Sequence, residues 1–280
     1  MLGSAWKLAD GVDIAGGTGA IEGLPTNVVI HIGAPDAPAM LSIGETYQYG
    51  SGSLNVFAPT NGSFSAHLST LRLGINRRDL GSGIQGTLDL RETLLEDFVV
   101  YGSALVGSWT NTASGYSDNR NGQGRLYLPT GDAEIKGSLY LGDAGNNSFG
   151  LLDLTGTRIR CDESVEIGKT GTVIVRMQGE SAGLDIASTA EDALIVEAGG
   201  TIHIDCFAPP SDQKQAYWGL RIAGDRCADL QALVNSGALT WDATALPANT
   251  QARFGIAYDE RVDKTVVGLL ARRSTLIFMR

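Results

Sequence analysis

The sequence predicts an all-β chain, a single-stranded β-solenoid (parallel β-helix) closed by a small C-terminal α+β cap. Composition is the first reason: 37 of 280 residues are glycine, and 43% are hydrophobic. Glycine weakens helices but suits tight turns between short strands. The second reason is a recurring pair of apolar residues separated by one residue, as in Leu71-x-Leu73. The third is internal similarity, because TLRLGINRRDLGSGIQGTLDLRET (70–93) resembles SLYLGDAGNNSFGLLDLTGT (138–157).

Apolar residues at positions i and i+2 have the strand period, so both side chains face the same side. The pairs begin at Ile30, Leu41, Leu54, Leu71, Leu88, Leu126, Leu139, Leu152, Val165, Val173, Leu184, Leu194, Ile202 and Leu220. Positions 54, 71 and 88 are 17 apart, and positions 126, 139, 152 and 165 are 13 apart.

Such short strands bury their apolar faces when coiling stacks like positions into one core. The turns outside the stack can then vary in length at little cost. A β-sandwich or jelly roll is the alternative, since it also has a strand about every 8–12 residues. Asn61-Gly62 and Asn121-Gly122 are hairpin signals that favour this alternative locally.

The predicted division places solenoid repeats at 1–208 and the cap at 209–280. The polar segment 108–124 is expected to project from the repeats as a long loop. In the cap, 225–237 predicts a helix with Asp225 as its N-cap and Gly237 at its end. Residues 252–271 predict a β-hairpin that turns at Asp259–Asp263.

The segments LRLG…GTLDL and LYLG…GLLDLTGT resemble the repeats of secreted bacterial β-helical proteins of the autotransporter-passenger and surface-adhesin kind. The stretch from YWGLRIAGD to DERVDKTVVG resembles the end of large exported proteins in which a sorting tail follows, and no such tail follows here. The resemblance covers roughly residues 50–270. It implies an exported structural or binding protein without a known catalytic site.

The charge and the N-terminus exclude several classes of function. A formal net charge of −10 disfavours nucleic acid and anionic membranes as partners. No segment has the ~20 apolar residues of a membrane span, so no membrane insertion is expected. The start MLGSAWKLADG has no signal-peptide pattern. The expected location, extracellular or at the cell surface, therefore comes from the resemblance.

The three cysteines, Cys161, Cys206 and Cys227, lack zinc-ligand spacing. We interpret them as small apolar core residues, with one disulfide plus a free thiol as the alternative.

The segment Gly179-Glu180-Ser181-Ala182-Gly183 matches the nucleophile elbow of serine esterases. That motif requires a helix after the serine, whereas LDIAS reads as a strand. The only later histidine is His203, within an alternating apolar run. We therefore expect Ser181 to lie in a turn.

A polysaccharide-active enzyme is the second alternative function, and it needs two carboxylates flanking the scissile bond. Asp89 and Asp153 occupy matching places in the two LDL units, and both should point outward as an acidic ladder. An ordinary solvated surface is the simpler interpretation. We predict no enzymatic activity.

Calcium is the one cofactor that the sequence leaves open. Asp143, Asn146 and Asn147 form an oxygen-rich loop, and Asp118–Asn121 forms another. Both lack the closing glutamate of an EF-hand.

Aromatic side chains are the candidates for carbohydrate binding, because sugars pack on such rings. Tyr127 and Tyr140 hold matching places 13 residues apart and are expected on one outer face, either binding glycan or stabilising the stack as a pair. Trp109 and Tyr116 lie in the projecting loop.

The function predicted from these observations is a non-enzymatic exported surface or extracellular-matrix protein with a structural or adhesive role. Its expected partner is cell-surface or extracellular polysaccharide, or itself. In the first alternative it is a filament subunit joined through terminal strands. Strand addition would then use Thr275, Leu276, Ile277 and Phe278.

Overall fold

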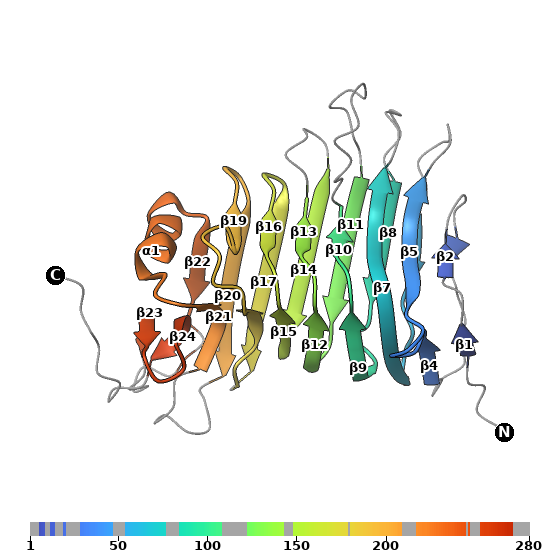
Figure 1. Cartoon of the computed structure of the whole chain (residues 1–280), viewed down its shortest axis with the longest axis horizontal. Coiled ribbons are helices and arrows are strands. Elements are labelled where there is room, and N and C mark those ends of the chain that lie inside the picture. The colour runs from blue at the N-terminus through green and yellow to red at the C-terminus, as the bar shows by residue number, and fades with distance from the viewer. Residues whose placement is uncertain are drawn as a thin grey trace.

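The computed structural model describes residues 29–46, 54–76, 84–107, 122–142, 148–178, 180–208, 217–244, 246 and 253–270, and the backbone of three short strands at 6–8, 12–14 and 19–20. Within this part of the chain, strands stand side by side along the long axis of the molecule (Figure 1). They form a 16-stranded sheet and an 8-stranded sheet. The protein is therefore mostly β, as the sequence predicts.

The strands fall into three ladders, each a continuous series of hydrogen-bonded neighbours. Ladder 1 contains β1 (Trp6–Leu8), β4 (Val29–Ile32), the first half of β7 (Ser63–Asn76), β9 (Leu94–Val100), β12 (Gly131–Ile135), β15 (Thr157–Cys161), β18 (Gly183–Ile186) and β21 (Tyr217–Ala223). Ladder 2 contains β2 (Val12–Ile14), β5 (Ala39–Thr46), the second half of β7, β10 (Ala104–Val106), β13 (Leu139–Leu141), β16 (Val165–Ile167) and β19 (Leu194–Val196). Ladder 3 is the 8-stranded sheet: β3 (Gly19–Ala20), β6 (Leu54–Phe57), β8 (Ile84–Asp89), β11 (Gly122–Leu128), β14 (Phe149–Thr155), β17 (Gly171–Gln178), β20 (Thr201–Ala208) and β22 (Leu239–Asp242).

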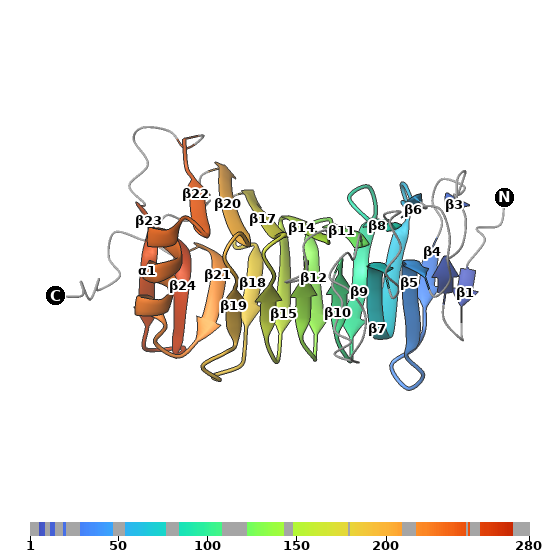
Figure 2. The same cartoon turned by 90° about the horizontal axis from the view of Figure 1, so that it is seen from above.

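The chain visits the ladders in a fixed order, 1 then 2 then 3, before it returns to ladder 1 (Figure 2). For example, β12, β13 and β14 follow one another in sequence but lie in ladders 1, 2 and 3. Each strand pairs in parallel with the strand of the next passage, as β11 does with β14. The hairpin signal at Asn61 does not make a hairpin, because β6 and β7 on either side of it belong to different sheets. Asn121 lies outside the described residues.

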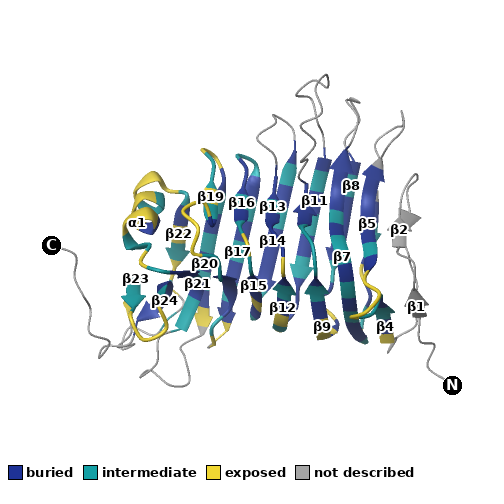
Figure 3. Cartoon of the chain, in the orientation of Figure 1, coloured by how far each residue is buried: buried dark blue, intermediate teal, exposed yellow. Residues whose placement is uncertain are grey.

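The core lies between the ladders and consists of the inward residues of every strand (Figure 3). In ladder 2, Leu41, Leu71 and Leu139 belong to one stacked inward row and are fully buried. Phenylalanines fill the core near β7, where the rings of Phe64 and Phe98 have centroids 6.2 Å apart. Stacking identical positions lets each strand bury a face that it could not bury alone.

Most of the predicted apolar pairs are these inward residues. The pair Leu54-x-Val56 is an error of phase: Asn55 and Phe57 are the buried residues, and Val56 is half-buried. The 13-residue spacing has a different meaning from the predicted one. Leu126 and Leu152 lie in ladder 3, whereas Leu139 lies in ladder 2, so one complete passage takes 26 residues here.

Glycine allows the backbones of ladders 2 and 3 to approach each other where β7 ends. Gly74 has φ +63°, and a Cβ built there would lie 2.0 Å from the Gln123 carbonyl oxygen. Across the same contact, a Cβ on Gly124 would lie 2.4 Å from the Leu73 carbonyl oxygen. No larger residue fits either position without moving the backbone.

The C-terminal end of the described chain departs from the parallel pattern. The helix α1 (Cys227–Ser236) lies within the predicted range 225–237 and ends at Gly237, which has φ +79°. Its N-cap is Arg226, one residue later than predicted, although the Cys227 N–H still donates to the Asp225 carboxylate at 3.2 Å. Helix α1 contacts β22 and β23 (Arg253–Asp259) and contributes buried Leu230 to the core.

The predicted hairpin consists of β23 and β24 (Lys264–Leu270), which pair antiparallel. Strand β24 also pairs antiparallel with β21, which extends the 16-stranded sheet and makes it mixed. Whether the chain divides into two domains at residue 208 stays a prediction. Among the described residues, no helix has the length and apolar character needed to cross a membrane.

Candidate functional site

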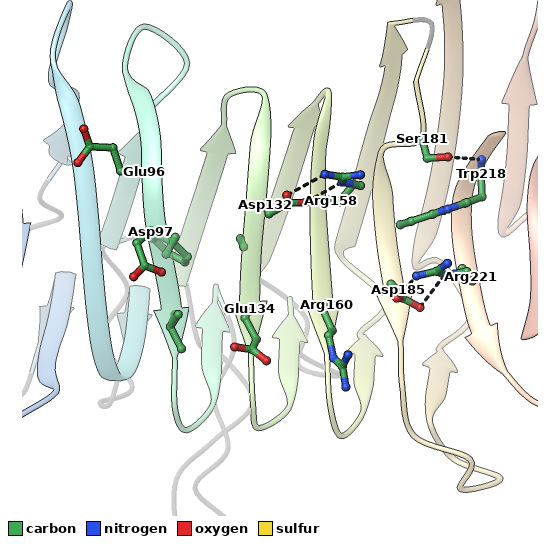
Figure 4. A pocket seen from close by; sticks show the side chains of 13 residues that line it. Glu96, Asp97, Asp132, Glu134, Arg158, Arg160, Ser181, Asp185, Trp218 and Arg221 are labelled. Atoms are coloured by element: carbon green, nitrogen blue, oxygen red, sulfur yellow. Dashed lines mark hydrogen bonds and ion pairs between the residues drawn. The ribbon is translucent and has the colours of Figure 1, made fainter. Parts of the chain in front are cut away.

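A groove of about 570 Å³ runs across the outer face of ladder 1, over β9, β12, β15, β18 and β21 (Figure 4). Its lining follows from strand alternation, because inward residues such as Ile159 enter the core while their neighbours face out. The lining side chains are Glu96, Asp97, Phe98, Val99, Asp132, Ala133, Glu134, Arg158, Arg160, Ser181, Asp185, Trp218 and Arg221.

The two kinds of charge occupy different ends of this groove. Carboxylates from β9 and β12 line one end, and arginines from β15 and β21 line the other, beside Trp218 (Figure 4). The separation follows from the register, since Asp132 lies beside Arg158 and Glu134 lies beside Arg160 on the neighbouring strand.

Carboxylate–guanidinium pairs join neighbouring strands at the centre of the groove. Arg158 donates from Nε and Nη2 to the two oxygens of Asp132, at 2.6 and 2.7 Å. This pair is exposed, with side-chain exposures of 50% and 70%, so it adds little stability. The hydrogen bond from Arg158 to Asp132 raises the pKa of the guanidinium.

The second pair is more deeply placed. Arg221 donates from Nε and Nη2 to Asp185, and Lys264 of the hairpin donates to Asp185 Oδ1 at 2.6 Å. Burial acts to raise the pKa of Asp185, but the hydrogen bonds from Arg221 and Lys264 outweigh it, and the pKa is lowered. Asp185 is therefore an anion held by two cations.

At the acidic end, Asp97 contacts a histidine outside the lining, with His67 Nε2 3.0 Å from Asp97 Oδ2. Lys136 Nζ lies 3.8 Å from Glu134 Oε2, a distance typical of a loose surface pair. The carboxylates of this end thus remain accessible to a ligand in the groove.

Trp218 is the aromatic residue of the groove. The Arg221 guanidinium carbon lies 4.5 Å from the centroid of its ring, a cation–π arrangement that fixes the indole. The Trp218 backbone N–H donates to Ser181 Oγ at 3.2 Å. Ser181 therefore anchors the strand that carries Trp218.

The environment of Ser181 agrees with its predicted place in a turn. The following residues form the strand β18 and no helix. His203 is engaged elsewhere, with Nδ1 2.8 Å from Thr240 Oγ1 and Nε2 2.7 Å from Asp205 Oδ1. These contacts give Ser181 a structural partner and no base.

The structure separates Tyr127 from Tyr140, so the expectation that they share an outer face is wrong. Tyr127 lies in ladder 3 between Asp89 and Asp153, and the Arg91 guanidinium carbon is 4.3 Å from its ring centroid. Tyr140 lies in ladder 2. The 13-residue spacing joins strands of different ladders and thus different faces of the molecule.

The predicted ladder of Asp89 and Asp153 is interrupted by Tyr127, which lies between them. Each carboxylate has its own cation: Arg91 Nη2 is 2.5 Å from Asp89 Oδ2, and Arg176 pairs with Asp153. The two aspartates therefore do not form a pair of facing carboxylates.

The remaining predicted site residues lie outside the described residues. They are Trp109 and Tyr116, the calcium candidates Asp143, Asn146 and Asn147, and the assembly candidates Thr275, Leu276, Ile277 and Phe278. In the part of the chain that the structure describes, no group of three or more His, Cys, Asp or Glu residues could hold a metal ion.

The cysteines are all free thiols, so a disulfide is not formed. Cys161 and Cys206 are buried in the core, as the apolar interpretation expects. Cys227, at the start of α1, is partly exposed.

Sequence reasoning missed the groove because its residues come from five strands and form no local motif. A signal exists in TRIRC (157–161), where Arg158 and Arg160 alternate with inward Ile159 and Cys161, and it is repeated around Arg221 in LRI. Two outward arginines on one strand indicate a charged outer face. Comparisons with protein-family models, with curated proteins and with solved structures find no match to this chain.

Proposed function

We propose that this chain is an exported β-solenoid with a structural and adhesive role at a cell surface or in an extracellular matrix, where it binds polysaccharide. The observation that supports the proposal best is the groove on ladder 1, which combines Trp218 with alternating carboxylates and guanidinium groups. Such combinations of a ring and hydrogen-bonding groups suit sugars, which have an apolar face and a polar rim.

The solenoid part of the proposal is supported by the fixed order in which the chain visits its three ladders and by parallel pairing between successive passages. A stack of this kind presents an extended surface in which each passage contacts only its neighbours. An adhesive protein gains from such a surface because it can contact a polymer at several points.

The non-enzymatic character is supported by the pairing of the most plausible catalytic carboxylates. A glycosidase needs one carboxyl group on each side of the scissile bond. Asp89 and Asp153 are each bound by an arginine of their own, and the ring of Tyr127 lies between their strands.

The test is retention of the purified chain on a panel of insoluble polysaccharides, with reducing sugar assayed in the supernatant. We expect retention on at least one polysaccharide with no release of sugar. Release of sugar would replace this proposal with an enzymatic one. Failure to bind every polysaccharide would remove the adhesive role. Solution scattering from the same sample is expected to give an elongated particle, and a compact sphere would contradict the solenoid.

A further inference from the structure

We propose that the groove on ladder 1 binds a neutral polysaccharide chain laid along the long axis of the molecule. This inference rests on the proposed adhesive function and names the site and the chemical class of its ligand. It depends on three features of the groove: its charge balance, its unused hydrogen-bonding capacity and its direction.

The charge balance disfavours an anionic ligand. The lining holds five carboxylates and three guanidinium groups, which are Glu96, Asp97, Asp132, Glu134, Asp185 and Arg158, Arg160, Arg221. Each of these arginines is already bound by a carboxylate, since Arg158 pairs with Asp132, Arg160 with Asp162 and Arg221 with Asp185. A uronic acid or sulfate would have to displace an internal carboxylate to reach a guanidinium group, and it would meet a net negative lining.

The hydrogen-bonding capacity suits a ligand rich in hydroxyl groups. A guanidinium group carries five N–H donors, and the bonds from Arg158 to Asp132 use its Nε and Nη2. A carboxylate accepts about four hydrogen bonds, so Asp132 also keeps acceptor capacity. Donors and acceptors placed side by side match hydroxyl groups, each of which donates one hydrogen bond and accepts two.

Trp218 supplies the apolar surface. Its ring is held by the cation–π contact with Arg221, and its strand is held by the bond to Ser181. A ring that is already ordered loses little conformational entropy when a sugar packs against it.

The direction follows from the sheet. Neighbouring strands lie about 4.8 Å apart, so the five strands β9, β12, β15, β18 and β21 span roughly 19 Å along the long axis. The outward row Glu134, Arg160, Asp185 and Arg221 follows this axis with one residue on each successive strand. A polymer lying on this row meets an alternating series of acceptors and donors.

The experiment measures the affinity of the full chain for soluble polysaccharides by isothermal titration calorimetry and affinity electrophoresis. The neutral probes are a β-glucan, a galactomannan and dextran, and the anionic probes are polygalacturonate and alginate, all at physiological salt. The variants are Trp218→Ala and Arg158→Gln. The control is Arg91→Gln, which removes a similar arginine–aspartate pair from the outer face of ladder 3.

We expect at least one neutral probe to bind. Trp218→Ala should weaken that binding about tenfold or more, Arg158→Gln should weaken it severalfold, and Arg91→Gln should leave it unchanged. Arg158 is half exposed, so its variant keeps the test valid should Trp218→Ala not fold. Near-identical melting temperatures of Arg158→Gln and the parent are the folding control.

Three outcomes would overturn the inference. Binding of a neutral probe that is unaffected by both groove variants would place the site elsewhere and leave the adhesive function standing. Preferential binding of polyuronates, lost in Arg158→Gln, would reverse the ligand class. Absence of binding to every polysaccharide, soluble or insoluble, would remove both this inference and the adhesive function.

Discussion

Lys264 Nζ lies 2.6 Å from Asp185 Oδ1, a contact between residues 79 apart in sequence that fastens the antiparallel hairpin to the parallel strands of ladder 1. The same carboxylate accepts from Arg221 on the intervening strand. Asp185 is almost fully buried at 6% exposure, so its removal would leave two cations without their anion. The attachment of the C-terminal strands thus depends on a single side chain.

Asp185→Asn should lower the free energy of unfolding by about 2 kcal/mol at neutral pH, because an amide cannot neutralise either cation. The exposed pair offers a matched control: Asp132→Asn should cost less than about 1 kcal/mol. Urea denaturation of the three proteins measures both values. Equal losses in the two variants would contradict the buried role of Asp185.

The pH dependence of stability follows from the same carboxylate. The pKa of Asp185 is lower in the folded chain than the value of about 3.9 expected when unfolded. Its contribution is therefore complete above that unfolded value and is lost as the pH falls through the folded pKa. The parent should lose more stability than Asp185→Asn between about pH 5 and pH 2. Parallel stability curves for the two proteins over that range would argue against this assignment.

Gly74→Ala should be strongly destabilising, by about 3 kcal/mol or more, because its Cβ would collide with the Gln123 carbonyl in addition to the strain of positive φ. Gly237→Ala isolates the strain, since Gly237 has φ +79° but nothing within 4 Å of the added atom. We expect a loss of about 1 kcal/mol there. Thermal unfolding of both variants compares them directly, and similar melting temperatures would show that ladders 2 and 3 are not in close contact.

The thiols should be nearly inert in the native protein. Burial raises the pKa of the Cys161 thiol far above its ordinary value. Burial, helped by the hydrogen bond with Asp225, raises the pKa of Cys227 to about 11. Titration with an aromatic disulfide reagent at pH 8 should label at most Cys227, slowly, and should count three thiols only after denaturation. Rapid labelling of Cys161 would indicate that ladder 1 opens.

Ser181→Ala should cost about 1 kcal/mol of stability, because the Trp218 backbone N–H loses its acceptor. A fluorophosphonate probe for serine hydrolases should leave the parent unlabelled. Covalent labelling that disappears in Ser181→Ala would instead make Ser181 a nucleophile.

The all-β class could be predicted because alternation and glycine content are local properties of the sequence. Ladder 1 was harder to recognise, since its inward positions include small residues such as Ala133 and Cys161 that weaken the apolar pattern. The inward Asn55 similarly shifted the apparent phase of β6 by one residue. Spacing alone could not separate Tyr127 from Tyr140, because a chain that alternates between ladders shows half of its true period.

The groove was not predictable from any single segment. Asp97, Arg158 and Trp218 become neighbours only through pairing of strands that are far apart in sequence. The register that aligns them is set by the core rows, and each outward residue is chosen by the inward residue beside it. Predicting the site therefore required the pairing first.

The arrangement of the ladders also determines how the chain bears tension. Strands lie side by side along the long axis, with β1 near one end and β23 near the other (Figure 1). A force that pulls these ends apart acts along the interstrand hydrogen bonds and loads them one after another. We expect the molecule to unzip in many small extensions at low force, each releasing one passage of the chain, and to re-zip when the load is removed. Such a protein would be a compliant tether that dissipates energy gradually, rather than a stiff link that breaks at a single threshold.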